Sequence, residues 1–168
     1  MRLSRWTMIG GPLGVVAAAA VWLGLARVLP VDDEATLPQR LALACAALLP
    51  MACVLNAMVL VQMRQRARSG AVDPLAGNDD RLLRVNQRVL TNTVEQLAGF
   101  APSLLALAAG VAPGWMRHVV SAGLTFAVAR LVFWAGYLQG PATRAPGMAA
   151  TFAVNVATLL AAIVVWSR

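Results

Sequence analysis

Five polar side chains recur at helical spacing between residues 81 and 95 of an otherwise apolar chain. Separations of three, four, four and three residues place them on one face of a helix: Arg81, Arg84, Arg88, Asn92 and Glu95. The planar guanidinium group of arginine binds a carboxylate through two parallel hydrogen bonds. This polar stripe therefore predicts either a site for an anionic ligand or a polar seam between helices.

A second set of side chains follows at the same spacing later in the chain. Arg130, Phe133 and Tyr137 are three and four residues apart, and Arg144 follows a Gly-Pro break at 140–141. A cation beside a thiol lowers the thiol pKa from about 8.5, and the thiolate is the reactive nucleophile. An arginine and a tyrosine hydroxyl at one pocket would therefore suit the activation of a bound thiol.

The chain that carries these residues has the composition of a membrane protein. Hydrophobic residues make up 60% and charged residues 12%, whereas soluble domains have about 45–50% and about 25%. The net charge is +7, from 14 basic residues, all arginine, and 7 acidic residues. The arginines cluster at the ends of apolar runs, as the positive-inside rule requires, which argues against nucleic acid as a partner. No grouping of histidine, cysteine and acidic residues predicts a metal site.

Five apolar runs predict an all-α, polytopic transmembrane bundle. They cover about 6–29, 39–63, 85–111, 115–138 and 145–166, each near the roughly 20 residues that a spanning helix needs. The first run also fits a cleaved signal peptide, but its long apolar core favours a retained helix. Gly10 and Gly14 in this run have the spacing that lets two helices approach closely.

The loops between the runs predict the orientation. The segment at 64–84 is rich in arginine, the loop at 139–147 carries Arg144 and no acidic residue, and the segment at 30–38 is acidic. Arginine excess marks the cytoplasmic side, so the N-terminus is expected in the cytoplasm. The membrane itself is expected to be a bacterial inner membrane. Within the runs, the amides of Asn56 and Asn155 predict interhelical hydrogen bonds. Cys45 and Cys53 are expected as small buried residues.

The depth of Glu95 limits what the polar stripe can face. Glu95 lies seven residues beyond Arg88, about 10 Å further along the helix. An ionisable group inside the bilayer is costly unless it is paired or faces water. The structural interpretation of the stripe is an interhelical ion pair between Glu95 and Arg130 that locks the bundle.

Two segments resemble the MAPEG family, the membrane-associated proteins of eicosanoid and glutathione metabolism. RVLTNTVEQ is similar to the family's R-x-x-x-N-x-x-E segment, and RLVFWAGYLQGPATR is similar to its second motif and downstream arginine. The resemblance covers about residues 43–168. It implies a four-helix domain at 39–168, preceded at 1–38 by an additional transmembrane helix and an acidic outward loop.

The resemblance also implies a homotrimer that binds glutathione between subunits near the cytoplasmic side. The residues implied to hold glutathione are Arg88, Asn92, Glu95, Arg130, Tyr137 and Arg144. Tyr137 and Arg144 would be catalytic, with Arg144 stabilising the thiolate. Either Arg66 or Arg68 corresponds to a basic position at the end of the family's first helix. Phe133 and Gln96 stand where eicosanoid-forming members have tyrosines.

Three functions remain open at this stage. The first is a glutathione transferase or peroxidase that acts on lipophilic electrophiles arriving from the bilayer. The second is a non-catalytic structural or accessory protein in which the arginines and Glu95 form an ion-pair network. Transport is third, because the runs lack the paired Gly/Pro interruptions of transporter repeats.

Overall fold

The computed structural model describes residues 5–32, 34–71, 73 and 77–168, with side chains from Met8 onward. These residues form five long α-helices and one short 3-10 helix, η1. Their bounds are α1 (Arg5–Val28), α2 (Leu37–Ser69), α3 (Arg81–Gly110), η1 (Pro113–Trp115), α4 (Met116–Gln139) and α5 (Ala145–Trp166).

Two helices extend beyond the predicted runs for local reasons. α2 continues to Ser69 because the arginines, the glutamine and the alanine after residue 63 are good helix formers. It stops at Gly70, whose φ of 70° is the left-handed conformation that favours glycine. α3 begins at Arg81, earlier than the predicted 85, because the Asp80 carboxylate accepts a hydrogen bond from the Leu83 N–H at 2.8 Å.

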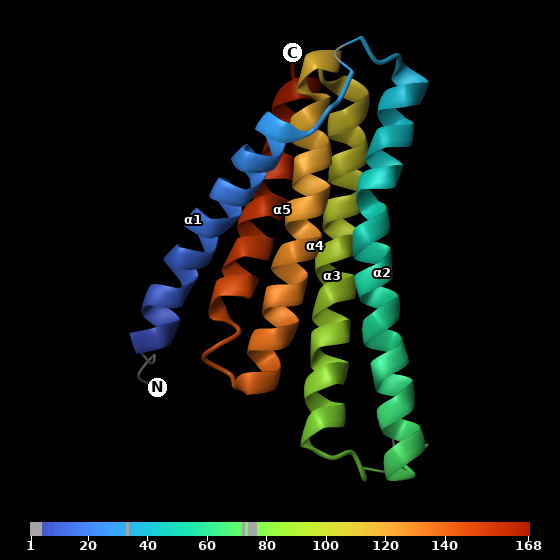
Figure 1. Ribbon diagram of the computed structural model, residues 1–168, viewed down its shortest axis with the longest axis vertical. Coiled ribbons are helices and arrows are strands. Elements are labelled where there is room, and N and C mark those ends of the chain that lie inside the picture. Colours follow the sequence, from blue (N-terminus) through green and yellow to red (C-terminus); the bar gives the residue numbers. More distant parts are fainter. Residues whose placement is uncertain (1–4, 33, 72, 74–76) are drawn as a thin grey trace.

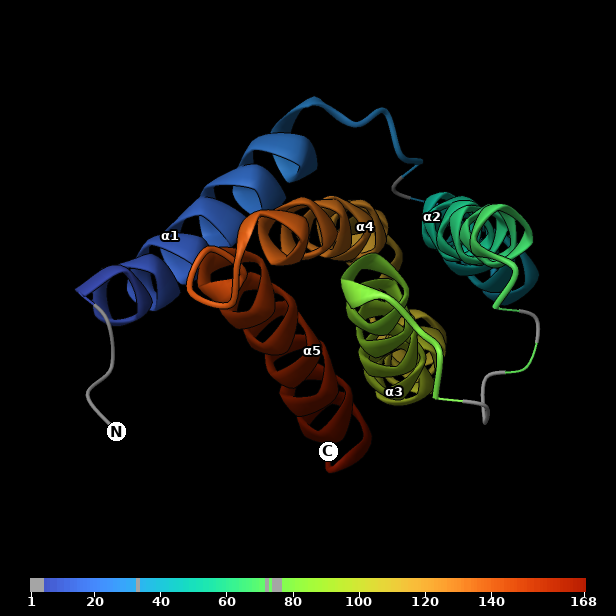
Figure 2. The same ribbon diagram turned by 90° about the horizontal axis from the view of Figure 1, so that it is seen from below.

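Helices α2 to α5 run side by side, and α4 contacts all the other α-helices (Figure 1). α1 is inclined to this group and packs on α4 and α5. It lies on the opposite side of the bundle from α2 (Figure 2). The α2–α3 hairpin extends beyond the α4–α5 turn at the same end of the molecule (Figure 1).

The core forms where α2, α3, α4 and α5 meet. Phe100 of α3 and Phe126 of α4 are fully buried and stack with ring centroids 4.0 Å apart. Gly123 of α4 brings α2 close, because a Cβ at this position would lie only 2.8 Å from the Ala47 Cβ. Small residues allow such close approach between membrane helices, where dispersion contacts replace the hydrophobic effect as the driving force.

In the described part of the chain, four helical segments are long and apolar enough to span a membrane. They are Met8–Val28, Leu37–Ser69, Pro113–Gln139 and Ala145–Trp166. α3 is outside this group because the polar stripe lowers its hydropathy, yet it packs against α2, α4 and α5. The predicted all-α transmembrane bundle is therefore confirmed, with the helix that carries the polar stripe packed against three others.

The predictions for the mid-helix asparagines and for the two cysteines depend on which helix faces are covered within the chain. Asn155 of α5 donates to the Gln96 carbonyl of α3 at 3.0 Å, as predicted. Asn56 is exposed and donates only to Ala52 of its own helix, so that prediction is wrong. Cys45 and Cys53 are also exposed, against expectation. Cys45, Cys53 and Asn56 all lie on the part of the α2 surface that no other described helix of this chain covers.

Candidate functional site

α3 carries the predicted polar stripe into the bundle. Arg84, at its start, donates to the Asp79 carbonyl and is thereby tied to the hairpin loop. Arg88 and Glu95 are exposed in the single chain, whereas Asn92 is half-buried between them. The helix thus presents its arginine near one end and its carboxylate deeper, as the spacing predicted.

The α4–α5 turn places Arg144 directly beside Tyr137. The Thr143 hydroxyl donates to the carbonyls of Gly136, at 2.6 Å, and of Gly140, at 2.9 Å. These bonds fold the turn back on the end of α4. The Arg144 guanidinium carbon then lies 4.6 Å from the centroid of the Tyr137 ring, within the range of a cation–π contact.

Four of the six predicted site residues line a cavity of about 190 Å³, whereas Glu95 and Arg130 do not line it. It is formed by α3, α4 and the start of α5, and its lining residues are Arg88, Asn92, Phe133, Tyr137, Arg144 and Met148. The lining includes two guanidinium groups and no carboxylate. Within the described part of the chain, neither guanidinium forms a hydrogen bond or ion pair. The arrangement is therefore suited to an anionic ligand.

Met148 is the one lining residue that the sequence did not indicate. A methionine in an apolar helix is usually a core residue. The one available signal was that Met148 follows Arg144 by four residues and therefore lies on the same face, one turn further along α5. Its backbone N–H donates to the Arg144 carbonyl at 3.0 Å. Phe133, which the sequence placed in the second motif, forms another wall and packs edge-on against Tyr137, with ring centroids 5.6 Å apart.

Arg130 lies behind this cavity and does not line it. Its side chain is fully buried in α4. The guanidinium donates to Thr93 Oγ1 at 2.6 Å and to Asn92 Oδ1 at 3.2 Å. It also stacks on Phe133 at 4.1 Å from the ring centroid. Arg130 thus holds the Asn92 amide, and through this amide it acts on the cavity wall.

The direct ion pair predicted between Glu95 and Arg130 does not form, because Asn92 lies between them. The Asn92 amide accepts from Arg130 with its oxygen and donates to Glu95 Oε2 with its nitrogen, at 3.4 Å. A fully buried guanidinium is thus linked to a carboxylate only through a neutral amide. An ion pair does form at the α2–α3 hairpin, between Arg66 and Asp79 at 3.0 Å.

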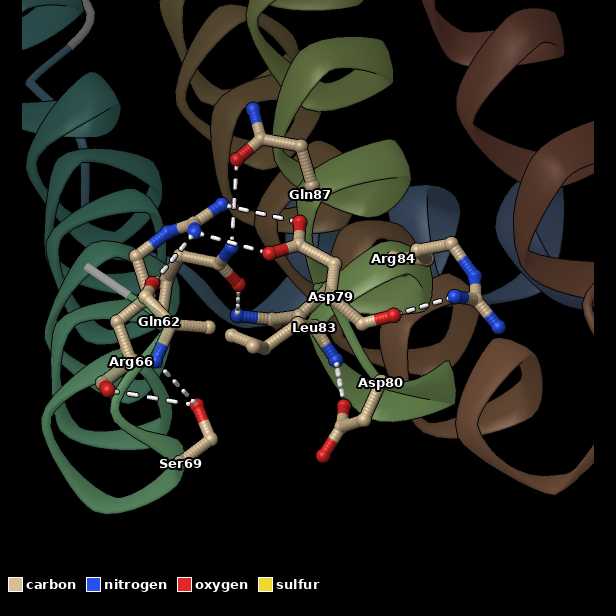
Figure 3. A network of polar contacts seen from close by, with 10 residues as sticks. Gln62, Arg66, Ser69, Asp79, Asp80, Leu83, Arg84 and Gln87 are labelled. Carbon is tan, nitrogen blue, oxygen red and sulfur yellow. Dashed lines mark hydrogen bonds and ion pairs between the residues drawn. The ribbon is translucent and has the colours of Figure 1, made fainter. Parts of the chain in front are cut away.

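Arg66 and Arg68, the two candidates for the family's basic position at the end of its first helix, lie away from the cavity. Arg66 forms two hydrogen bonds with the Asp79 carboxylate, at 3.0 and 3.2 Å, across the α2–α3 hairpin (Figure 3). Arg68 is exposed. In this chain Arg66 therefore fixes the hairpin loop.

A buried amide network that the sequence did not indicate fixes α3 beside α2 and α4. Asn86 is fully buried. Its nitrogen donates to Gln62 Oε1 at 3.0 Å and to the Met58 carbonyl at 3.2 Å, and its oxygen accepts from Trp134 Nε1 at 2.9 Å. Gln62 also donates to Gln87 at 3.3 Å (Figure 3). This network precedes Arg88 by half a turn and sets the face that α3 turns to the cavity.

A bundle of apolar helices around one helix with a polar stripe defines a polytopic membrane protein, and its arginine-lined cavity is a candidate site. Comparison with known families identifies the class more closely. The profile of the MAPEG family matches residues 42–164, and the chain belongs to this family. Its matched region begins in α2, so that α1 lies outside it. No curated protein and no solved structure matches the chain.

Proposed function

We propose that the protein is a glutathione-dependent transferase or peroxidase that acts on lipophilic electrophiles. The observation that carries this proposal is the cavity where Arg88 of α3 and Arg144 of the α4–α5 turn converge without a carboxylate between them. Membership of the MAPEG family, which includes glutathione transferases and non-catalytic proteins, is consistent with it.

The charges of the site match those of glutathione, which carries two carboxylates and one ammonium group. In this proposal Arg88 binds a carboxylate, and Glu95 binds the ammonium group. Asn92 binds a peptide group of the ligand through its amide, which Arg130 orients from behind. Charges at membrane depth are favourable only when they are paired or face water, so binding of the charged tripeptide would complete the polar stripe.

Arg144 holds the sulfur as a thiolate, and Tyr137 supplies a hydroxyl beside it. The Tyr137 ring supports the guanidinium at 4.6 Å and so fixes its direction. A positive charge at this position lowers the pKa of a nearby thiol. Glutathione, when bound, supplies the nucleophilic sulfur that bonds to an electrophilic carbon or oxygen, whose leaving group departs with the electron pair.

The site is completed by further copies of the chain in a homotrimer. The cavity of about 190 Å³ in one chain is smaller than the roughly 300 Å³ at which ligand pockets begin. Arg88 and Glu95 are exposed in the single chain, and charged groups at membrane depth must face protein or water. A neighbouring subunit over this face of α3 would satisfy both requirements.

The cavity is proposed to open toward the cytoplasm of a bacterial inner membrane. The α2–α3 hairpin and the α4–α5 turn lie at the same end of the bundle (Figure 1), and the hairpin carries exposed arginines at residues 64, 68, 81 and 84. By the positive-inside rule this end is cytoplasmic. The first turn of α1 lies at the same end (Figure 1), and the lipophilic co-substrate enters from the bilayer.

The alternative is a non-catalytic member of the family. It is favoured by the Arg130–Asn92–Glu95 chain of hydrogen bonds, which ties α3 to α4 without any ligand. Under this alternative the polar stripe is a structural seam, and the open guanidinium groups of Arg88 and Arg144 bind other subunits.

Calorimetric titration of the purified protein in detergent with glutathione decides between the two. The variants are Arg88→Ala with Arg144→Ala, beside Arg81→Ala with Arg68→Ala as a control that removes the same charge from exposed positions away from the cavity. Saturable binding that the first pair abolishes and the second retains supports the enzyme. Absence of binding by a folded wild type refutes it and leaves the structural alternative.

A further inference from the structure

α1 touches the start of α5 backbone to backbone. Gly10 and Gly14 are both buried on the face of α1 that packs against α5. A Cβ added to Gly14 would lie 2.7 Å from the Cα of Pro146, and one added to Gly10 would lie 3.2 Å from its ring. Pro146, which follows Arg144 by two residues, thus packs against the two glycines Gly10 and Gly14.

α4 contacts the same short segment just as closely. A Cβ on Gly136 would lie 3.0 Å from the Cα of Arg144, and one on Gly147 would lie 2.8 Å from the carbonyl carbon of Val132. The backbone from residue 143 to 147 is therefore in direct contact with α4 and with α1. Figure 1 shows this turn beside the first turns of α1.

The side chain of Arg144 depends on this backbone for its position. Among the described residues, its guanidinium contacts the Tyr137 ring. A long side chain held by one cation–π contact has little to fix it beyond the placement of its own backbone. Any shift of Pro146 is thus passed to Arg144 over two residues of helix.

We propose that α1, through Gly10 and Gly14, is a positioning element for Arg144. It presses on Pro146 and holds the start of α5 where the guanidinium covers Tyr137. The assignment rests on the proposed function only in what Arg144 then does to a bound thiol. α1 precedes the region matched by the family profile, so this contact is an addition of this chain to the matched core.

The single tyrosine of the chain, Tyr137, provides a direct test that needs no ligand. Incorporation of 3-fluorotyrosine gives one ¹⁹F resonance, which senses the cation above the ring. The reference variant is Arg144→Ala. The test variant is Gly14→Ala, and the matched control is Gly24→Ala in the same helix, where an added Cβ meets nothing within 4 Å.

The Gly14→Ala resonance is expected to move at least halfway from the wild-type position toward that of Arg144→Ala. Gly24→Ala is expected to remain at the wild-type position. Gly10→Ala, where the added Cβ is tight but not overlapping, gives a smaller shift in the same direction and serves if Gly14→Ala does not fold. Wild-type resonances for the folded Gly10 and Gly14 variants would overturn the proposal.

The thiol pKa of bound glutathione, measured from the absorbance of the thiolate, provides the functional readout. Gly14→Ala is expected to raise this pKa toward its value in Arg144→Ala, whereas Gly24→Ala leaves it unchanged. If the wild type binds no glutathione, the proposed function fails and the fluorine shifts still decide the positioning role. If the wild type ionises the thiol and Gly14→Ala does so equally, the positioning role alone is refuted.

Discussion

Replacement of Asn86 by leucine tests whether the buried amide network holds α3 in place. Asn86 is fully buried and forms three hydrogen bonds, to Gln62, to the Met58 carbonyl and from Trp134. Leucine has the same number of side-chain heavy atoms with the same branching, so the substitution removes the polar contacts while it keeps the shape, although its two methyl groups are bulkier than the amide oxygen and nitrogen. The Trp134 N–H is then left without its acceptor.

The expected loss follows from the three bonds. Interhelical hydrogen bonds in membrane proteins contribute about 0.6 kcal/mol each on average and up to about 1.7 kcal/mol. Three such bonds, one of which leaves a buried indole N–H unsatisfied, give a loss of about 2 kcal/mol in the free energy of unfolding. The apolar side chain regains part of this through dispersion contacts, so a larger loss is not expected.

Reversible unfolding in mixed micelles, followed by tryptophan fluorescence, measures this difference. Asn56→Leu is the matched control, because Asn56 is exposed and donates only to its own helix at 2.9 Å. It is expected to change stability by less than about 0.5 kcal/mol. A loss below about 0.5 kcal/mol for Asn86→Leu, equal to that of the control, would refute the reasoning that the network fixes α3.

Three further predictions concern the site and the hairpin. Arg144→Ala is expected to raise the thiol pKa of bound glutathione by about one unit, equivalent to about 1.4 kcal/mol, in a spectrophotometric titration; an unchanged pKa would remove Arg144 from the proposed mechanism. Arg130→Met is expected to weaken glutathione binding about tenfold, since the Asn92 amide loses its partner. The same variant should change stability little, because a buried charge without a carboxylate partner is exchanged for apolar packing; calorimetry beside thermal unfolding checks both, and unchanged affinity would contradict the role of Arg130. For the half-buried Arg66–Asp79 pair, a double-mutant cycle with alanine should give a coupling of about 0.5–1 kcal/mol that shrinks in high salt, and a coupling of zero at low salt would show that the pair does not hold the hairpin.

The sequence was sufficient for the class of fold because hydropathy and length act over whole segments. Runs of about 20 apolar residues and the position of the arginines predicted five helices before any contact was known. The family followed from two short motifs, which the family match then confirmed. Helix ends were less certain, since they depend on single caps such as Asp80 and Gly70.

The candidate site was predictable in part. Spacing placed Arg88 and Asn92 on one face of a helix, because helical period is a local property. It could not show that Tyr137 and Arg144 meet that face at one cavity, since this depends on how α4 and α5 pack. It also predicted a direct Glu95–Arg130 pair, where the structure places Asn92 between the two charges.

By itself the sequence determined that the chain is a membrane bundle with a costly polar stripe, because composition and period need no partner. Only the tertiary structure decided what each polar group faces. Asn86 and Asn56 are both amides in apolar helices, yet one is the centre of an interhelical network and the other lies exposed. The difference arises from which face each helix turns toward its neighbours, and this is set by packing between segments far apart in the chain.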